Sequence, residues 1–198
     1  MDSKSNSTGT SAYSDDIRQA IDVMNRGGII AYPTDTIWGL GCDATNADAV
    51  RRIYEIKRRD DSKALITLVD SEAKVEFYVK EVPEVAWQLI EVADKPLTII
   101  YDNARNLAPN LIAEDGSIAI RITSEPFSRE LCRRFKKAIV STSANVSGEP
   151  SPKTFAEISR EILDAVNYVC TSRRDENAPH TPSSIIQLGV SGEIKVIR

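Results

Sequence analysis

The stretch STSANVSG, residues 141–148, follows the apolar run AIV (138–140) and precedes EPSPKTFAEI (149–158). It is rich in hydroxyl side chains, with one amide and one glycine, and it contains no acid, no base and no histidine. An apolar run that ends in such residues is typical of a buried strand that opens into a loop, which is where α/β proteins bind ligands. The stretch therefore predicts an α/β fold with a ligand at the end of this strand. The alternative is a plain polar turn.

On both sides of this stretch, segments with strand and helix patterns alternate. Strands are expected at 29–32, 63–69, 96–101, 117–123, 138–143, 167–172, 184–189 and 193–198. Helices are expected at 14–26, 49–57, 71–79, 83–93, 124–135 and 155–166. The last two strands flank the turn VSG and read as a hairpin. The order predicts one domain, α/β (α+β) in class, with an open, twisted, mixed β-sheet flanked by helices.

Three helix starts carry capping signals. Ser14 precedes the first helical stripe, Thr45 with Asp48 resembles a capping box, and Thr154 with Glu157 resembles another. Each signal predicts where a helix begins.

The segment SIAIRIT (117–123) alternates, so three isoleucines share one face while Ser117 and Arg121 share the other. An arginine in the middle of a strand usually marks an edge or a solvated face, and that interpretation is favoured here. The alternative is that this face lines a cleft, with Ser117 and Arg121 pointing into it.

KRRDDSK (57–63) holds four cations in seven residues, which suits the binding of a phosphate or another anion. A solvated charged loop is an equal alternative. Lys57 also continues the apolar stripe of the helix before it, and a lysine there usually extends its amine to water.

The bulk composition excludes several classes. The net charge of −4 and pI near 5.2 argue against binding nucleic acid by overall charge. Three scattered cysteines and one histidine exclude the usual zinc spacings, and no protein-bound metal is expected. Residues 1–13 lack the apolar core of a secretory signal and read as a disordered lead-in to a domain over 14–198. A soluble, cytoplasmic protein without a membrane partner is expected.

Familiar catalytic motifs are missing from the sequence. GLG (39–41) is a weak dinucleotide signal, and neither a Walker phosphate loop nor a nucleophile elbow is present. YPTDT (32–36) reads as a turn after a strand. His180 lies in the polar loop 173–182 and is given no catalytic role. These features favour an anion-binding cleft made of hydroxyls and cations.

Several motifs together resemble the YrdC-like family of threonylcarbamoyl-AMP synthases. They are YPTDTIWGLGCDA (32–44), KRR (57–59), SIAIR (117–121), STSANVSGEPSP (141–152) and PSSII (182–186). The resemblance runs in order from about residue 15 to Arg198 and is to the short form of the family, without the additional C-terminal domain. It implies a YrdC-like sheet with a concave, positively lined groove.

The resemblance also implies the reaction. L-threonine, bicarbonate and ATP give threonylcarbamoyl-AMP and pyrophosphate, and a partner tRNA threonylcarbamoyl transferase system then modifies adenosine 37 of tRNA. This makes the chain a nucleotidyltransferase with ATP as substrate and Mg²⁺ carried on ATP. The second hypothesis is a non-catalytic double-stranded RNA-binding or ribosome-assembly module, and the third is a paralogue that uses another acceptor.

Residue roles follow from the resemblance alone. The catalytic signature falls on Lys57, Arg59, Ser143 and Asn145. Threonine binding falls on Thr34, Arg121, Ser143 and Ser183. ATP binding falls on Arg59, Lys63, Ser117, Asn145, Ser151 and Arg198. Asp60, Ala64, Leu68 and the stretch 93–98 depart from the family pattern, which leaves the choice of substrate open. Loop 173–182 is a candidate lid.

Overall fold

The computed structural model describes residues 13–59, 65–176 and 182–198. Its α-helices are α2 (Ser14–Asn25), α3 (Ala47–Lys57), α4 (Glu72–Tyr78), α5 (Val85–Val92), α6 (Pro126–Phe135) and α7 (Arg160–Ala165). Two 3₁₀ turns are η1 (Pro109–Leu111) and η2 (Phe155–Glu157). The strands are β1 (Ile30–Tyr32), β2 (Gly39–Gly41), β3 (Ile66–Val69), β4 (Leu97–Tyr101), β5 (Ile118–Ile122), β6 (Ile139–Ser143), β7 (Tyr168–Val169), β8 (Ser184–Leu188) and β9 (Ile194–Val196).

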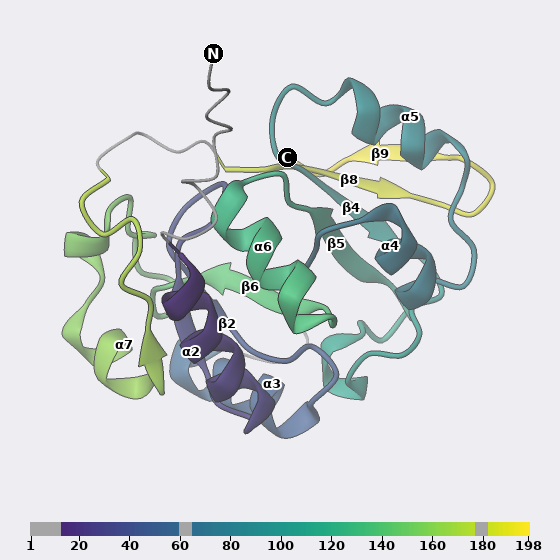
Figure 1. The fold of residues 1–198 in the computed structure, drawn as a ribbon. Coiled ribbons are helices and arrows are strands. Elements are labelled where there is room, and N and C mark those ends of the chain that lie inside the picture. The colour runs from purple at the N-terminus through teal and green to yellow at the C-terminus, as the bar shows by residue number, and fades with distance from the viewer. Residues whose placement is uncertain (1–12, 60–64, 177–181) are drawn as a thin grey trace, which may run out of the picture.

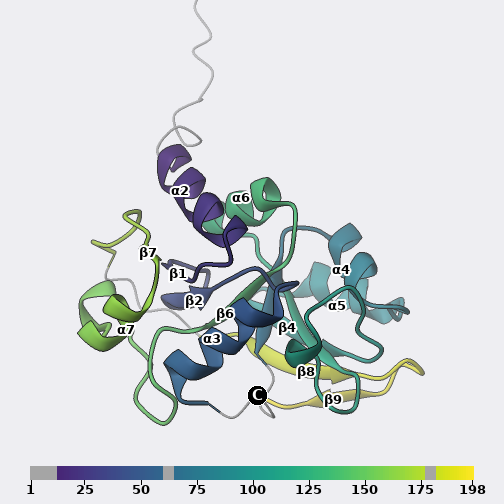
Figure 2. The ribbon, with the colours of Figure 1, turned by 90° about the horizontal axis from the view of Figure 1, so that it is seen from below.

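The strands form one mixed sheet in the order β7-β1-β2-β6-β3-β5-β4-β8-β9. The pairs β1–β7, β3–β5 and β4–β8 are parallel, and the other neighbours are antiparallel. The mixed α/β class is therefore confirmed, as is the C-terminal hairpin of β8 and β9. Helices α2 and α6 lie side by side over one face of the sheet, and α7 lies at its β7 end (Figures 1 and 2).

The helices are held by amphipathic stripes. In α6 the buried positions Phe127, Leu131 and Phe135 recur every four residues and so face the sheet together. Glu125 caps this helix, because its carboxylate accepts from the backbone N–H of Phe127 and Ser128. Pro126 occupies the first helical position, where its missing N–H is tolerated.

Three expectations about helix starts were wrong. Tyr13, not Ser14, is the N-cap residue of α2. Asn46 caps α3, since its side chain accepts from two backbone N–H groups, while the Thr45 hydroxyl donates to Asp43 instead. The expected helix 155–166 is divided: η2 ends, and α7 begins under a new cap, Ser159.

The strand β2 was not expected from the sequence. Its residues GLG pair antiparallel with β1 and with β6. At Gly41 an added Cβ would lie 2.6 Å from the Tyr32 ring and 3.1 Å from a backbone oxygen. The two glycines are therefore explained by close packing within the sheet rather than by a dinucleotide.

The lead-in expected at 1–13 falls almost wholly outside the described residues. Tyr13 is described, and its ring lies edge-on against Phe127 at 5.4 Å between centroids. None of the helices in the described part of the chain is both long and apolar enough to cross a bilayer.

Candidate functional site

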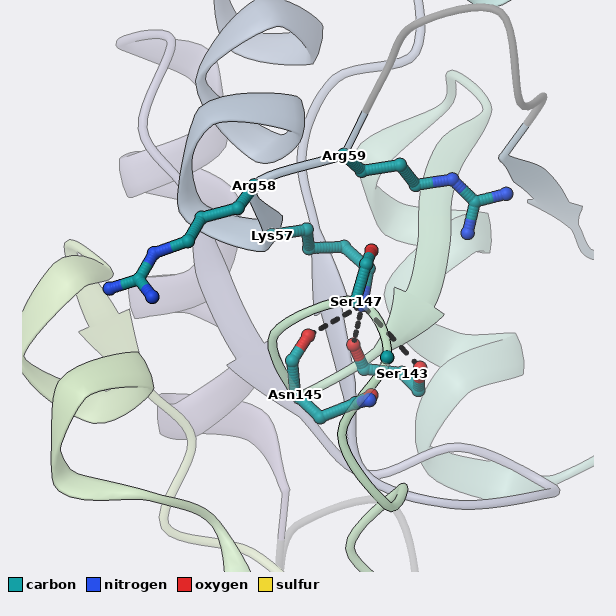
Figure 3. Close-up of a pocket in the computed structure, with 7 residues that line it drawn as sticks. Lys57, Arg58, Arg59, Ser143, Asn145 and Ser147 are labelled. Atoms are coloured by element: carbon teal, nitrogen blue, oxygen red, sulfur yellow. Dashed lines mark hydrogen bonds between the residues drawn. The ribbon is translucent and has the colours of Figure 1, made fainter.

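Lys57 joins the end of α3 to the STSANVSG loop. Its side chain is buried, and Nζ donates to the carbonyl oxygens of Ser143 at 2.6 Å and Asn145 at 2.7 Å (Figure 3). The Ser143 hydroxyl lies 3.5 Å from the same amine. The Ser147 N–H in turn donates to the Lys57 carbonyl at 2.8 Å. The expectation that this lysine extends to water was wrong: it fixes the loop that follows β6.

The charge of Lys57 is affected by its surroundings. Burial, and then the neighbouring Arg59 cation, lower the pKa of Lys57 to about 8. Its two carbonyl acceptors favour the protonated form, because a cationic donor makes stronger hydrogen bonds. Lys57 therefore carries its proton at neutral pH, next to the Ser143 hydroxyl.

Asn145 is oriented by the backbone of its own loop. Its Nδ2 donates to the carbonyls of Val146 at 3.0 Å and Glu149 at 2.8 Å. Its buried Oδ1 has no hydrogen-bond partner among the described residues. A buried acceptor without a donor is costly in a folded protein. This oxygen is thus available to accept from a ligand.

These side chains line a first cavity of about 460 Å³. Its lining residues are Lys57, Arg58, Arg59, Ser143, Asn145, Ser147 and Gly148. Arg58 and Arg59 point to opposite sides of Lys57 (Figure 3). Arg58 makes an exposed ion pair with Glu161 at 2.6 Å. Arg59 points away from Arg58 and also lines the neighbouring cavity.

The second cavity, of about 450 Å³, shares Arg59 and Ser143 with the first. Its cations are Arg59, Arg121, Lys153 and Arg198. Its hydroxyl residues are Thr34, Thr36, Ser141, Thr142, Ser143, Ser151 and Ser183. Among the described residues that line the two cavities there is no aspartate or glutamate. In a chain of net charge −4, this local excess of cations suits anionic ligands.

Arg121 lies in the interior of the sheet rather than on an edge. Its strand, β5, pairs with β3 and β4, and its side chain is 3% exposed. The favoured interpretation of a solvated face was therefore wrong, and the cleft interpretation is confirmed for Arg121 because it lines the second cavity. Its NH2 forms an ion pair with Asp35 Oδ1 at 3.0 Å. Arg121 Nε has no hydrogen-bond partner in the described part of the chain, so it can donate to a ligand.

Asp35 is the counter-ion on the turn after β1. Burial raises the pKa of Asp35, while the Arg121 cation beside it acts in the opposite direction. On the same turn, the Thr34 hydroxyl donates to the Ile37 carbonyl at 2.7 Å and accepts from the Thr36 N–H at 3.1 Å. The turn is therefore an internally hydrogen-bonded wall of the second cavity.

Ser183 enters the second cavity from the residue before β8. Its hydroxyl accepts from the buried Thr98 hydroxyl at 3.0 Å, which leaves the Ser183 proton free to be donated. The Arg198 guanidinium donates to the Ser183 carbonyl at 3.2 Å. Thr98 was not identified from the sequence, because only the pairing of β4 with β8 brings it to Ser183.

The two cavities bring together most of the residues expected from the sequence. The second is lined by all four threonine candidates, Thr34, Arg121, Ser143 and Ser183, and by the ATP candidates Arg59, Ser151 and Arg198. Lys57 and Asn145 line the first. Thr36 and Lys153 line the second cavity but were not singled out.

Some expected residues lie elsewhere. Ser117 lines neither cavity; it is buried, and its N–H donates to Asp115 at 3.0 Å. Leu68 is buried and also lines neither. Lys63, Asp60 and Ala64 lie outside the described residues, as do residues 177–181 of the candidate lid at 173–182. Within the described ranges there is no group of three or more histidine, cysteine, aspartate or glutamate side chains arranged to hold a metal.

Comparison with known proteins identifies relatives of this chain. The family model for Sua5, YciO and YrdC, described as telomere recombination, matches residues 22–198. A protein of Vibrio cholerae named threonylcarbamoyl-AMP synthase is 32% identical over 177 residues, which are 88% of this chain and 93% of the relative.

Two solved structures are similar in fold. The crystal structure of P. abyssi Sua5 complexed with L-threonine superposes with a TM-score of 0.80 at 26% identity, over 92% of this chain and 53% of that one. The crystal structure of E. coli YciO superposes with a TM-score of 0.78 at 22% identity, over 92% of this chain and 87% of that one.

Proposed function

This chain belongs to the Sua5/YciO/YrdC family, and from that membership we propose that it is an L-threonylcarbamoyladenylate synthase. The reaction would join L-threonine, bicarbonate and ATP into threonylcarbamoyl-AMP and release pyrophosphate. The product would pass to a partner tRNA threonylcarbamoyl transferase system. The chain would then be an enzyme of the nucleotidyltransferase class that works in the cytoplasm, with a YrdC-like domain over residues 14–198.

One observation carries the proposal: two adjoining cavities share Ser143 and Arg59, and their described linings are cationic without acids. ATP carries negative charge on its phosphates and threonine on its carboxylate. These anionic groups repel each other unless cations surround them. Two neighbouring cavities with a shared wall can hold two such substrates side by side. Arg121, with its unpartnered Nε, suits the threonine carboxylate.

The chemistry requires no protein nucleophile. The threonine amine, once deprotonated, attacks CO₂ to give a carbamate with release of a proton, or attacks bicarbonate to give the same carbamate with loss of water. A carbamate oxygen then attacks the α-phosphorus of ATP, and pyrophosphate leaves with the electron pair of the broken P–O bond. Catalysis of such a step comes from positioning and from cations that stabilise charge on the transferring phosphate.

We propose residue roles that carry over from the family resemblance and agree with where each side chain lies. Lys57 would hold the Ser143–Asn145 loop and place a positive charge beside the Ser143 hydroxyl. Arg59 would neutralise phosphate charge from the wall that both cavities share. Ser143 would contact both substrates, and Asn145 would accept a hydrogen bond through Oδ1. Ser151 and Arg198 would lie around ATP, and Thr34 and Ser183 around threonine.

ATP would bring Mg²⁺ with it. Mg²⁺ in proteins usually keeps several waters and binds substrate phosphates. The cationic linings of the two cavities fit the phosphates of such a complex better than they fit a bare cation. We therefore propose that phosphate oxygens and water hold the ion.

A double-stranded RNA-binding module is the alternative. The basic segments KRR (57–59), RELCRRFKK (129–137) and TSRR (171–174) were the reason to consider it. Arg133 pairs with Glu130 at 2.7 Å, Lys137 pairs with Asp43 at 2.5 Å, and Arg134 donates to the Ser14 carbonyl at 3.3 Å. Paired cations offer less charge to a phosphate backbone, so the structure does not favour this alternative over the synthase.

The experiment is a pyrophosphate-release assay with ATP and Mg²⁺, run with and without threonine and bicarbonate. Release that needs both co-substrates supports the synthase. Release that needs neither supports a paralogue with another acceptor. No release, together with tight binding of an RNA duplex at physiological salt, supports the RNA-binding module.

A further inference from the structure

We propose that Arg173 and Arg174, which follow β7, are positioning residues for the two substrates. Arg173 holds the threonine side of the second cavity, and Arg174 holds the ATP side. The inference rests on the proposed synthase function for the identity of the substrates. Neither arginine lines the second cavity. Arg173 contacts Thr34, which lines it, and Arg174 acts through Phe155 and Trp38, which lie within two residues of the lining residues Lys153 and Ile37.

Arg173 ties the turn after β1 to the start of α6. Its NH1 donates to the Thr34 carbonyl at 3.2 Å and lies 2.9 Å from Glu125 Oε1. Its NH2 lies 2.7 Å from Glu176 Oε2. The Arg173 side chain is 11% exposed, so these interactions are little screened by water. Since Glu125 also caps α6, Arg173 connects the turn to a fixed point of the fold.

The turn 33–36 is therefore held by two arginines from different elements, Arg121, which is buried, and Arg173, which is largely buried. Arg121 of β5 pairs with Asp35, and Arg173 binds the carbonyl of the residue before it. Thr34 and Arg121 are both assigned to threonine. Loss of Arg173 would let the turn move and would change the positions of the Thr34 and Arg121 side chains. A misplacement of about 1 Å in a substrate-positioning group can cost about 100-fold in rate.

Arg174 acts on a different set of residues. Its guanidinium donates to the carbonyls of Cys170 and Val169, each at 2.8 Å, which fixes it against the end of β7. The guanidinium carbon lies 4.6 Å from the centroid of the Phe155 ring, a cation–π contact. Phe155 packs on Trp38 with centroids 4.9 Å apart. The Arg174 guanidinium thus stacks on Phe155 and supports the Phe155–Trp38 pair.

The aromatic pair adjoins the ATP candidates. Phe155 begins η2, shortly after Ser151 and Lys153, which line the second cavity. The Trp38 carbonyl accepts from the Ala144 N–H at 3.0 Å, between Ser143 and Asn145. Arg174 therefore supports the segment that carries Ser151 and the segment that carries Asn145, both ATP candidates, and neither segment belongs to the turn 33–36.

The segment that carries the two arginines is itself anchored. The Asp16 carboxylate of α2 accepts from the backbone N–H of Thr171 at 3.0 Å and of Ser172 at 2.7 Å, and from the Tyr168 hydroxyl at 2.7 Å. Arg173 has a φ of 61°, in the left-handed region that favours glycine. Such a conformation persists where the surroundings hold it, and it clusters at functional sites.

The kinetic test uses Arg173→Met and Arg174→Met, which keep an unbranched apolar stem. The Michaelis constant for each substrate is measured by pyrophosphate release with the other substrates saturating. Arg173→Met should raise the Michaelis constant for threonine about 10-fold and leave that for ATP within about twofold. Arg174→Met should do the reverse. Arg173→Lys, which keeps the charge but not the fork, should recover part of the loss.

Arg160→Met is the matched control. Arg160 is an arginine on α7 whose side chain is 86% exposed and pairs with Asp164. Arg160 lines neither cavity, so its replacement should leave the Michaelis constants for threonine and ATP unchanged. If Arg173→Met and Arg174→Met raise both constants alike, or change neither, the inference is overturned.

A second measurement does not depend on activity. Amide hydrogen exchange followed by mass spectrometry should be faster in peptides covering 33–37 for Arg173→Met, and in peptides covering 151–158 for Arg174→Met. Faster exchange spread equally over both segments, or unchanged exchange, would overturn the inference. If the wild-type chain releases no pyrophosphate with threonine, the proposed function fails, and the exchange pattern still decides whether the arginines hold the two walls.

Discussion

Replacing Lys57 by methionine tests the centre of the site. Methionine keeps the length of the side chain and removes the charge and the donors. Two hydrogen bonds are lost, from Nζ to the carbonyls of Ser143 and Asn145. The Ser143 hydroxyl also loses its cationic neighbour. The question is whether the loss appears in stability or in catalysis.

The expected free energies distinguish an effect on stability from an effect on catalysis. Burial and Arg59 lower the pKa of Lys57 from 10.5 to about 8, so the charged form is disfavoured by at most about 3 kcal/mol in the folded chain. Methionine removes that penalty. It also leaves two carbonyls without their donor, at about 1–3 kcal/mol each, although water from the cavity can replace part of this. These terms nearly cancel, so the free energy of unfolding should change by less than about 2 kcal/mol.

Catalysis has no such compensation. An electrostatic donor that acts on the transition state contributes about 3 kcal/mol, which corresponds to about 150-fold in kcat/KM. The assay is pyrophosphate release at pH 7.5, run beside urea denaturation of the same samples. We expect Lys57→Met to lose about 100-fold in kcat/KM while remaining folded.

Lys74→Met is the matched control. Lys74 is another largely buried lysine, bonded to Asp70 and to the Cys132 carbonyl at 2.7 Å, and it lines neither cavity. The Lys74→Met variant should be less stable than the wild type and should keep its kcat/KM. A Lys57→Met enzyme with near-normal kcat/KM, or one that loses activity only because it is unfolded, would refute the reasoning.

Three further predictions concern single groups. Arg121→Lys keeps a charge beside Asp35 but loses Nε, so the Michaelis constant for threonine should rise about 10-fold with little change for ATP, and equal rises for both would contradict the assignment. Between pH 8 and 10.5 the unfolded chain holds a proton on Lys57 that the folded chain has lost, so the free energy of unfolding rises with pH. From pH 7 to 9.5, urea titrations should show the wild type gaining up to about 2 kcal/mol of stability relative to Lys57→Met, and parallel pH dependences of the two proteins would argue against the lowered pKa. Asn46→Ala removes the acceptor for the N–H groups of Asp48 and Ala49 and should cost about 1 kcal/mol of stability by the same method, whereas a change near zero would argue against this cap.

The sequence predicted the order of the elements well, because local patterns determine it. The alternation of Ile118 and Ile120 with Arg121 gave the strand and its two faces, and both isoleucines are buried. Helix starts were less predictable, since neighbouring polar residues compete for one cap. Thr45 and Asn46 are both suitable, and Asp43 engages the first. The three residues of β2 were too few to show a period.

The site was predictable where a residue looked out of place in its own element. Lys57 on an apolar stripe and Arg121 within a strand gave such signals, and both line cavities. Thr98 and Arg173 gave none. Arg173 reaches Thr34 across 139 residues of sequence, and Thr98 meets Ser183 across 85. Contacts of this kind depend on how the strands are ordered, which one sequence does not reveal.

The most direct test of the central claim is to follow the carbon of bicarbonate. The purified chain is incubated with ATP, Mg²⁺, threonine and isotopically labelled bicarbonate, and the nucleotide products are separated and weighed by mass spectrometry. The account predicts a labelled threonylcarbamoyl-AMP, formed one for one with pyrophosphate and reduced about 100-fold in rate by Lys57→Met. AMP and pyrophosphate without a labelled adduct, or no turnover of ATP by the folded wild-type chain, would contradict it.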